Sequence, residues 1–209
     1  MIRRKIKFAG NNYKTRLDVA DYIKDAIFIN NEINHLNVIA KKVAERFKDA
    51  KKPAIVCVGS RNHNFDIFGP VMYDTFIKAG VNEKYLYWFD GVTAFDVIPD
   101  IKEKEHDVTL AFDAEVLIDD RNDVLKIRLR EDPVKPGAGV GKNIDAVGDF
   151  SVTLPIGFKR DVKHIVLNSD LWYEIKDIEF ICTLFVRLFL REVKPFYNFL
   201  EESNKILEV

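Results

Sequence analysis

The stretch Ala54-Ile55-Val56-Cys57-Val58, which ends at Gly59, decides the fold of this 209-residue chain. All five residues are apolar, without polar alternation, and this is typical of a strand that is covered on both faces. A polar loop follows, and Gly69-Pro70 then opens a stretch with helical spacing that continues to Ala79. Proline suits the first turn of a helix, because its missing N–H would have no partner there. The segment therefore predicts a buried strand, a turn and a helix.

The alternation of strands and helices continues beyond this first unit. Residues 85–89 and 108–112 form two further apolar runs, and residues 93–105 between them are partly helical in pattern. A more polar strand is predicted at 124–130, and strand character returns at 150–154. Consecutive units of this kind join by right-handed crossovers. The order predicts an α/β fold, a three-layer α/β/α sandwich around a mainly parallel, doubly wound sheet.

Helical spacing also marks both ends of the chain. Apolar residues recur at steps of three and four within 17–48 and again within 171–189, and a last helix is predicted at about 195–207. The length fits one well-buried domain. We therefore expect a single α/β domain over 1–209, with 1–50 as a helical extension packed on it.

Composition and charge narrow the class of protein. Hydrophobic residues make up 47% of the chain, and 32 Lys and Arg balance 33 Asp and Glu, so the net charge is −1. With this balance the protein has no overall positive potential that would attract nucleic acid or an anionic membrane. The longest apolar run, 180–190, is too short for a membrane span and contains Arg187. Cys57 and Cys182 lie in apolar runs and are expected to be reduced core thiols of a cytoplasmic protein.

Two aspartates are placed where chemistry is expected. In a flavodoxin-like strand order the first and third strands are neighbours, and ligands bind beyond their carboxyl ends. Asp66 follows the first strand and Asp113 ends the third predicted strand. Two close carboxylates do not easily both ionise, so one would hold a proton near neutral pH and the pair could act as acid and base. The alternative is structural, because aspartate after a strand commonly caps a helix or closes a turn.

A glycine-rich loop is the second candidate feature. Residues 135–142 read Lys-Pro-Gly-Ala-Gly-Val-Gly-Lys, with glycines at 137, 139 and 141. Glycine permits positive φ and a close approach of backbone to ligand. The run lacks phosphate-loop spacing, because Asn143 follows Lys142. It therefore favours a shaped loop over the crevice, with anion binding by its amides as a weaker alternative.

Three motifs together resemble a known group of proteins. The segment 55–70 holds an aspartate seven residues after the strand-ending glycine and three before a Gly-Pro pair. Residues 111–114 read Ala-Phe-Asp-Ala, and 136–142 are followed by Val-Gly-Asp-Phe-Ser-Val at 147–152. These motifs resemble those of the spore germination proteases and, most closely in the glycine loop, of their shorter relatives, the YyaC-type sporulation proteins. The resemblance covers about 53–190, which we take as the family-like part of the domain.

The resemblance implies a fold like that of the hydrogenase maturation proteases and a sporulation-associated peptidase in the cytoplasm of a spore-forming cell. Asp66 and Asp113 would be its catalytic acid–base pair, and bulky Phe65 would narrow the crevice or raise the pKa of Asp66. Its relatives in fold bind nickel through two carboxylates and a histidine, but no histidine lies in the glycine loop, so no metal or cofactor is expected. The expected substrate-binding residues are Asn62, His63, Gly69, Gly137, Gly139, Gly141 and Asp149.

The implied partner is a protein or peptide substrate, with small basic spore proteins as the candidates. The competing hypothesis is a non-catalytic sporulation protein that keeps the fold and uses the crevice to bind a peptide or a partner. A homo-oligomer is left open.

Overall fold

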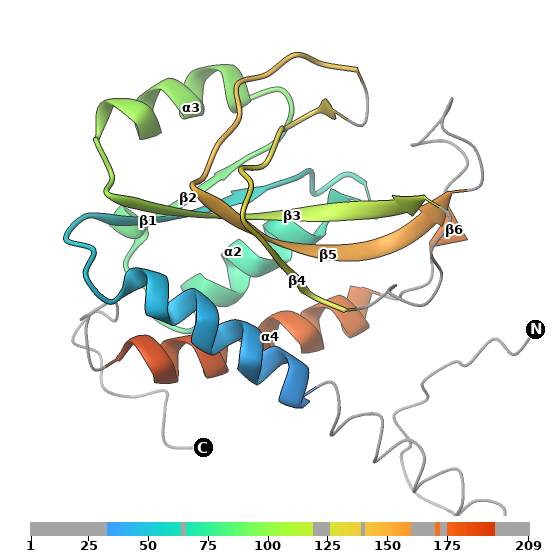
Figure 1. The fold of residues 1–209 in the computed structure, drawn as a ribbon. Helices are drawn as coiled ribbons and strands as arrows, with labels where there is room; N and C mark the ends of the chain where they lie inside the picture. Colours follow the sequence, from blue (N-terminus) through green and yellow to red (C-terminus); the bar gives the residue numbers. More distant parts are fainter. Residues whose placement is uncertain are drawn as a thin grey trace, which may run out of the picture.

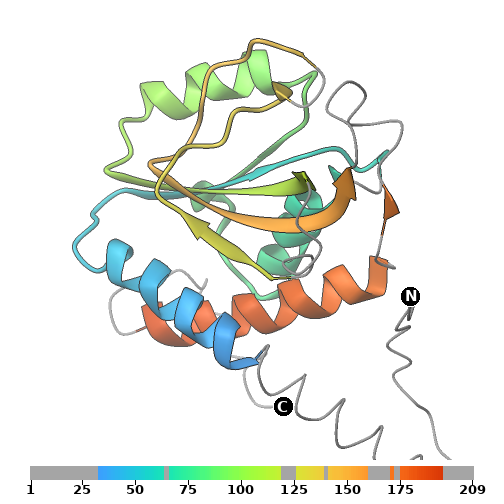
Figure 2. The same ribbon diagram turned by 45° about the vertical axis from the view of Figure 1, so that its right-hand side comes forward.

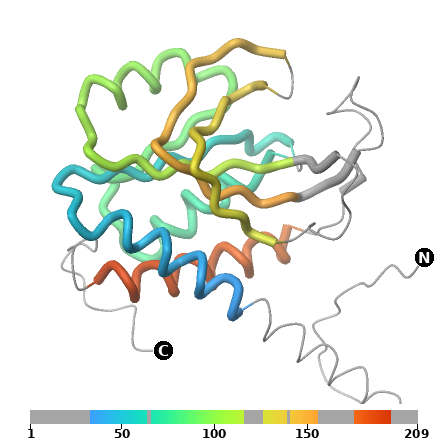
Figure 3. The backbone as a smooth tube through the Cα atoms, viewed as in Figure 1, coloured from blue at the N-terminus to red at the C-terminus, as the bar shows by residue number. Residues whose placement is uncertain are grey.

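A computed structural model describes residues 33–63, 66–118, 126–138, 141–159, 170–171 and 175–194. Their centre is one mixed sheet with the strand order β2-β1-β3-β5-β4, to which β6 adds by pairing with β5 (Figure 1). Figure 3 traces the path of the same backbone as a tube. The strands are β1 (Pro53–Val58), β2 (Leu86–Phe89), β3 (Val108–Ile118), β4 (Arg128–Arg130), β5 (Phe150–Lys159) and β6 (Asp170–Leu171). Neighbours among β2, β1, β3 and β5 are parallel, whereas β4 and β6 are antiparallel to β5. The predicted mainly parallel sheet, with β1 beside β3, is confirmed.

Helices cover both faces of this sheet. Helices α2 (Phe68–Lys78) and α4 (Ile175–Val193) lie on one face together with the helix at 33–47, and α3 (Ala94–Glu103) lies on the other (Figure 1, Figure 2). The short 3-10 helix Glu83–Tyr85 leads into β2. The three-layer α/β/α sandwich expected from the strand–helix alternation is therefore the observed architecture.

The larger core lies between the sheet and the layer of α2, α4 and 33–47. Its centre is a set of fully buried phenylalanine rings, and Phe47 makes edge contacts with Phe150 at 6.3 Å and with Phe189 at 5.5 Å between ring centroids. Such aromatic pairs favour edge-to-face geometry. Cys57 and Cys182 are both free and buried in this core, and burial raises the pKa of both thiols. The prediction of core thiols is confirmed.

Several predicted boundaries are corrected by the structure. β3 does not end at Asp113 but continues to Ile118, because β5 extends beside it as far as Lys159. Leu171 belongs to β6, and α4 begins at Ile175. Strand β5 is likewise twice as long as the apolar run at 150–154 suggested, since it continues past Leu154.

Parts of the predicted organisation lie outside the described residues. These are the first half of the predicted helix at 17–48 and the predicted helix at 195–207. The second half of the first helix is present at 33–47, where its apolar face is buried in the larger core. Within the described part of the chain, no helix combines the length and apolar character needed to cross a membrane.

Candidate functional site

The turn after β1 places Asp66 at the carboxyl end of the sheet. Gly59 ends β1 with a φ of +138°, and a Cβ there would lie 2.2 Å from the carbonyl oxygen of Asp66. A side chain at Gly59 would therefore collide with the returning chain. The Asp66 carboxylate accepts a hydrogen bond of 2.9 Å from the backbone N–H of Ser60, which fixes it over the end of the strand.

The Asp66 carboxyl titrates far from its ordinary range. Its pKa is raised to about 6, mainly by burial and to a smaller extent by the negative charge of Asp90. The hydrogen bond from Ser60 and the charge of His63 act in the opposite direction. The raised pKa agrees with the expectation for Asp66, although Phe65, the residue predicted to cause it, lies outside the described residues. Near neutral pH Asp66 is mostly ionised, so it can accept a proton.

Asp113 lies on β3, one residue beyond the pairing of Cys57 in β1 with Phe112. It keeps some exposed surface, yet desolvation of its carboxyl is the main reason that its pKa is raised well above the ordinary value. The charge of Asp66 is the second cause, ahead of that of Glu115, while a backbone hydrogen bond from Ala114 opposes them. The charge of Asp66 thus acts on Asp113 and helps to raise its pKa, so the two carboxyls are electrostatically coupled.

The glycine loop reaches the same edge of the sheet. Gly137 and Gly141 have φ values of +71° and +73°, and thus adopt the positive φ that glycine permits. A Cβ at Gly137 would meet the Cβ of Lys142 at 2.9 Å, because the loop closes tightly on itself. Lys142 then donates from Nζ to the carbonyl oxygen of Gly91 at 3.0 Å, just after β2. Gly139 lies outside the described residues.

The other predicted substrate-binding residues separate into two groups. Asn62 and His63 are exposed in the loop between β1 and α2, close enough to Asp66 for the charge of His63 to affect it. Gly69 is buried in α2, where a Cβ would lie 1.9 Å from the carbonyl oxygen of Val58. The absence of a side chain at Gly69 therefore permits the close packing of α2 on β1.

Asp149 lies away from the aspartates, at the amino end of β3. Its carboxylate accepts from the N–H of Thr109 at 2.6 Å, and its own N–H donates to the carbonyl of Thr109 at 2.8 Å. These bonds join the start of β5 to the start of β3, whereas Asp113 lies four residues further along β3. The structure therefore places Asp149 as a residue that aligns two strands.

Replacing Asp149 with alanine is expected to lower the free energy of unfolding by about 1–2 kcal/mol, because the N–H of Thr109 loses a charged acceptor. Asp149→Asn should cost less, since its amide oxygen can still accept. Urea unfolding of both variants measures this. A substrate-binding role would instead predict unchanged stability and weaker peptide binding in both variants.

A polar cluster beside Asp113 was not predicted. Arg130 donates to the carboxylate of Glu115, Arg128 lies 3.8 Å from the same oxygen, and the hydroxyl of Thr153 donates to the other oxygen at 2.9 Å. The register pairs Asp113 with Thr153 and Thr153 with Arg128, so the cluster continues the row that Asp113 begins. The sequence could have indicated one part of this cluster, because Glu115 lies two residues after Asp113 and residues two apart on a strand share a face.

A metal site made by side chains would need at least three ligating groups close together. Over the ranges that the structure describes, no group of three or more His, Cys, Asp and Glu side chains is arranged to hold a metal ion. The chemistry that these residues can perform is proton transfer between carboxyl groups of unequal pKa.

The raised pKa values predict that stability increases on mild acidification. A carboxyl whose pKa is raised on folding destabilises the fold when the pH is high enough to ionise it in the unfolded chain. For Asp66 this penalty grows between about pH 4 and pH 6 and reaches about 3 kcal/mol, and Asp113 extends it to higher pH. We expect the free energy of unfolding to be at least about 1 kcal/mol larger at pH 5 than at pH 7.5.

Urea unfolding at the two pH values measures this difference. The half-buried Asp74 and Asp90 have lowered pKa values and stay ionised across this window, so they do not contribute. The double variant Asp66→Asn, Asp113→Asn should lose most of the pH dependence. If the free energy of unfolding changes equally between the two pH values in wild type and in the double variant, the aspartates are not the groups responsible.

Comparisons with known proteins place the chain in a family. No curated protein matches it. Among solved structures it is similar to a [NiFe] hydrogenase maturation protease HycI from Thermococcus kodakarensis KOD1, with a TM-score of 0.47 and 11% identity over 73% of this chain and 98% of that one. The sequence model described as "Protein of unknown function (DUF1256)" matches residues 27–178, which include the helix at 33–47 as well as the sheet. The chain therefore belongs to the DUF1256 family.

Proposed function

We propose that this protein is a peptidase in which Asp66 and Asp113 form the acid–base pair. The observation that supports the proposal most strongly is electrostatic: burial raises the pKa of both carboxyls, and the charge of Asp66 raises that of Asp113 further. Pairs of carboxyls whose environments push their pKa values apart are typical of acid–base sites. Asp66 follows the carboxyl end of β1, and Asp113 lies on β3 one residue beyond its pairing with β1. The strand order reverses between these two strands, which is where α/β sheets bind ligands.

The chemistry assigns a different task to each carboxyl. Ionised Asp66 takes a proton from a water molecule, whose oxygen adds to the carbonyl carbon of the peptide bond. Protonated Asp113 gives its proton to the leaving nitrogen as the C–N bond breaks. The products are a carboxylic acid and an amine, and the pair is left with its proton on Asp66. Exchange with solvent then returns the proton to Asp113, which has the higher pKa.

The substrate we propose is a small basic spore protein, following the resemblance of the three motifs to germination proteases. Asp66 and Asp90 supply negative charge next to the candidate site, which favours a cationic chain. The turn before α3 and the first residues of α3 expose apolar surface, since Val92 is 73% exposed and Phe95 is 60% exposed. This turn contacts the glycine loop, because Gly91 accepts from Lys142. An apolar side chain of the substrate would lie there.

A cleavage assay tests the proposal. The purified protein is incubated with small basic spore proteins near pH 7.5, and the products are identified by mass spectrometry. The matched control is Asp49→Asn, because Asp49 is an exposed aspartate that precedes β1, at the strand end opposite to the one that Asp66 follows. We expect cleavage at defined bonds by wild type and by the control. Saturable binding without cleavage at any pH between 5 and 8 would instead support the non-catalytic alternative.

A further inference from the structure

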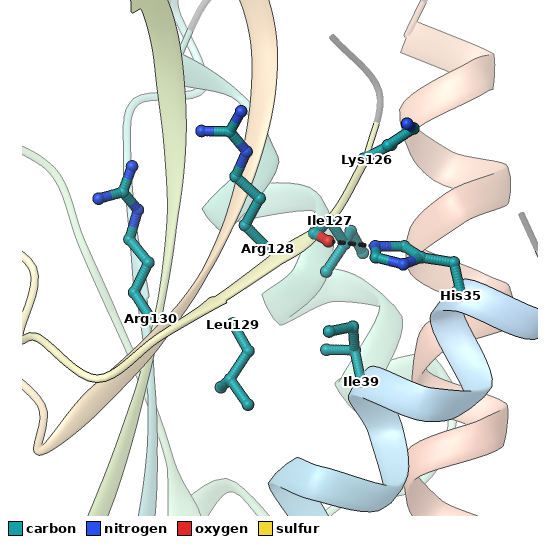
Figure 4. Close-up of a pocket in the computed structure, with 7 residues that line it drawn as sticks. All are labelled: His35, Ile39, Lys126, Ile127, Arg128, Leu129 and Arg130. Carbon is teal, nitrogen blue, oxygen red and sulfur yellow. Dashed lines mark hydrogen bonds between the residues drawn. The ribbon is translucent and has the colours of Figure 1, made fainter. Parts of the chain in front are cut away.

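The edge of the sheet formed by β4 borders a hollow that the candidate site does not use. The hollow has a volume of about 390 Å³ and lies between β4 and the helix at 33–47 (Figure 4). We call it the β4 groove, and its lining residues are His35, Ile39, Lys126, Ile127, Arg128, Leu129 and Arg130. Among the described residues that line it, apolar and basic side chains are combined and none is acidic.

The backbone of β4 faces this groove. The ring Nε2 of His35 lies 2.7 Å from the carbonyl oxygen of Ile127, on the side of β4 that faces away from β5 (Figure 4). In an antiparallel strand, alternate residues direct their backbone groups to the same side. The N–H and C=O of Leu129 therefore also point into the groove. β4 is the last strand on its side of the sheet within the described part of the chain.

We propose that the β4 groove binds an extended, acidic segment of a partner protein, which adds to the sheet as a strand alongside β4. Its backbone would pair with the N–H and C=O of Leu129, as edge-strand recognition requires. Its apolar residues would lie against Leu129 and Ile39 on the groove side of the sheet.

The positive charges of the β4 groove determine which sequence an added strand should have. Residues opposite Arg128 and Arg130 on an added strand lie on the same face as these arginines, and opposite charges across a strand pair are stabilising. Arg130 uses one nitrogen to bind Glu115, its side chain is 41% exposed, and a guanidinium carries five N–H donors. A carboxylate on the incoming strand could therefore bind beside Glu115. The matching pattern is acidic, apolar, acidic.

The same charges disfavour a second copy of this chain. Antiparallel pairing of two β4 strands about Leu129 would place Arg128 of one copy opposite Arg130 of the other. Like charges directly opposite one another destabilise a strand pair. The acidic partner is therefore the occupant that the groove favours.

Fluorescence anisotropy with a labelled nonapeptide of alternating glutamate and valine tests this inference. We expect saturable binding to the full-length protein, at least 5-fold tighter than for the peptide with glutamine in place of glutamate. Arg130→Gln should remove this preference. Leu129→Pro should weaken binding at least 10-fold, because it deletes an N–H that faces the groove and not β5, a position where proline is tolerated.

A second measurement does not depend on the folding of any variant. Hydrogen exchange of the wild-type Leu129 amide should slow when the glutamate peptide is added. Unchanged exchange at a saturating peptide concentration, or equal binding of the glutamate and glutamine peptides, would overturn the proposal. A concentration-dependent dimer that Leu129→Pro abolishes would also overturn it, since it would assign the edge to a second copy. None of these outcomes depends on peptidase activity.

Discussion

Asp66→Asn and Asp113→Asn are each expected to reduce peptide cleavage by about 10²–10⁴-fold, the range that a positioned acid or base contributes. Asparagine keeps the shape of the side chain but cannot accept or donate the transferred proton. Initial rates of cleavage, measured near pH 7.5 with excess substrate, give the size of the effect. The control Asp49→Asn should cleave at the wild-type rate.

The same two variants are expected to be at least as stable as wild type near neutral pH. The fold bears the cost of an ionised, desolvated Asp66 or of a protonated Asp113, and the amide removes that cost. A capping aspartate would behave in the opposite way and lose about 0.5–2 kcal/mol on replacement. Wild type that fails to cleave, together with two less stable variants, would contradict the catalytic assignment.

Gly69→Ala is expected to destabilise the protein by about 3 kcal/mol or more. A Cβ at this position would lie 1.9 Å from the carbonyl oxygen of Val58 and 2.6 Å from its carbonyl carbon. These are backbone atoms inside β1, so no side chain can move to make room, and α2 must shift away from the sheet. Thermal or urea unfolding measures the loss.

The matched control for Gly69 is Gly91→Ala. Among the described residues outside its own turn, a Cβ at Gly91 would have within 4 Å the Nζ of Lys142 alone, at an ordinary contact distance of 3.6 Å, and this side-chain end can move. We expect a change within about 0.5 kcal/mol. Similar losses for the two variants would show that the close packing of α2 on β1 is not what Gly69 provides.

The fold could be predicted because its central strands are uninterrupted apolar runs. Residues 54–58 are covered on both faces of the sheet, so an uninterrupted apolar run is enough to predict this strand. The buried face of the helix at 33–47 is predicted by apolar residues that recur at steps of three and four. The end of β3 was missed for a related reason. Beyond Phe112 one face of the strand becomes polar, with Asp113 and Glu115, and a strand with one polar face is not recognised from an apolar run.

The candidate site was predicted in part, because sequence position fixes which strand end a residue follows but not what it contacts. Asp66 and Asp113 follow from the strand order, since β1 and β3 are adjacent. Asp149 follows a glycine-rich loop in the sequence, yet parallel pairing of β3 and β5 carries it to the amino end of the sheet. The partners of Glu115 depend on β5 lying between β3 and β4, a strand order that no local pattern predicts.

The most direct test of the acid–base pair needs no substrate. Titration of the aspartate side-chain carboxyl carbons by ¹³C NMR, in wild type and in Asp66→Asn, measures the pKa of Asp113 with and without its neighbour's charge. We predict that Asp113 is still protonated at pH 7 in wild type and that its pKa falls in Asp66→Asn, because one cause of the rise has been removed. An Asp113 that titrates near pH 4 and is unaffected by Asp66→Asn would contradict the shared acid–base pair.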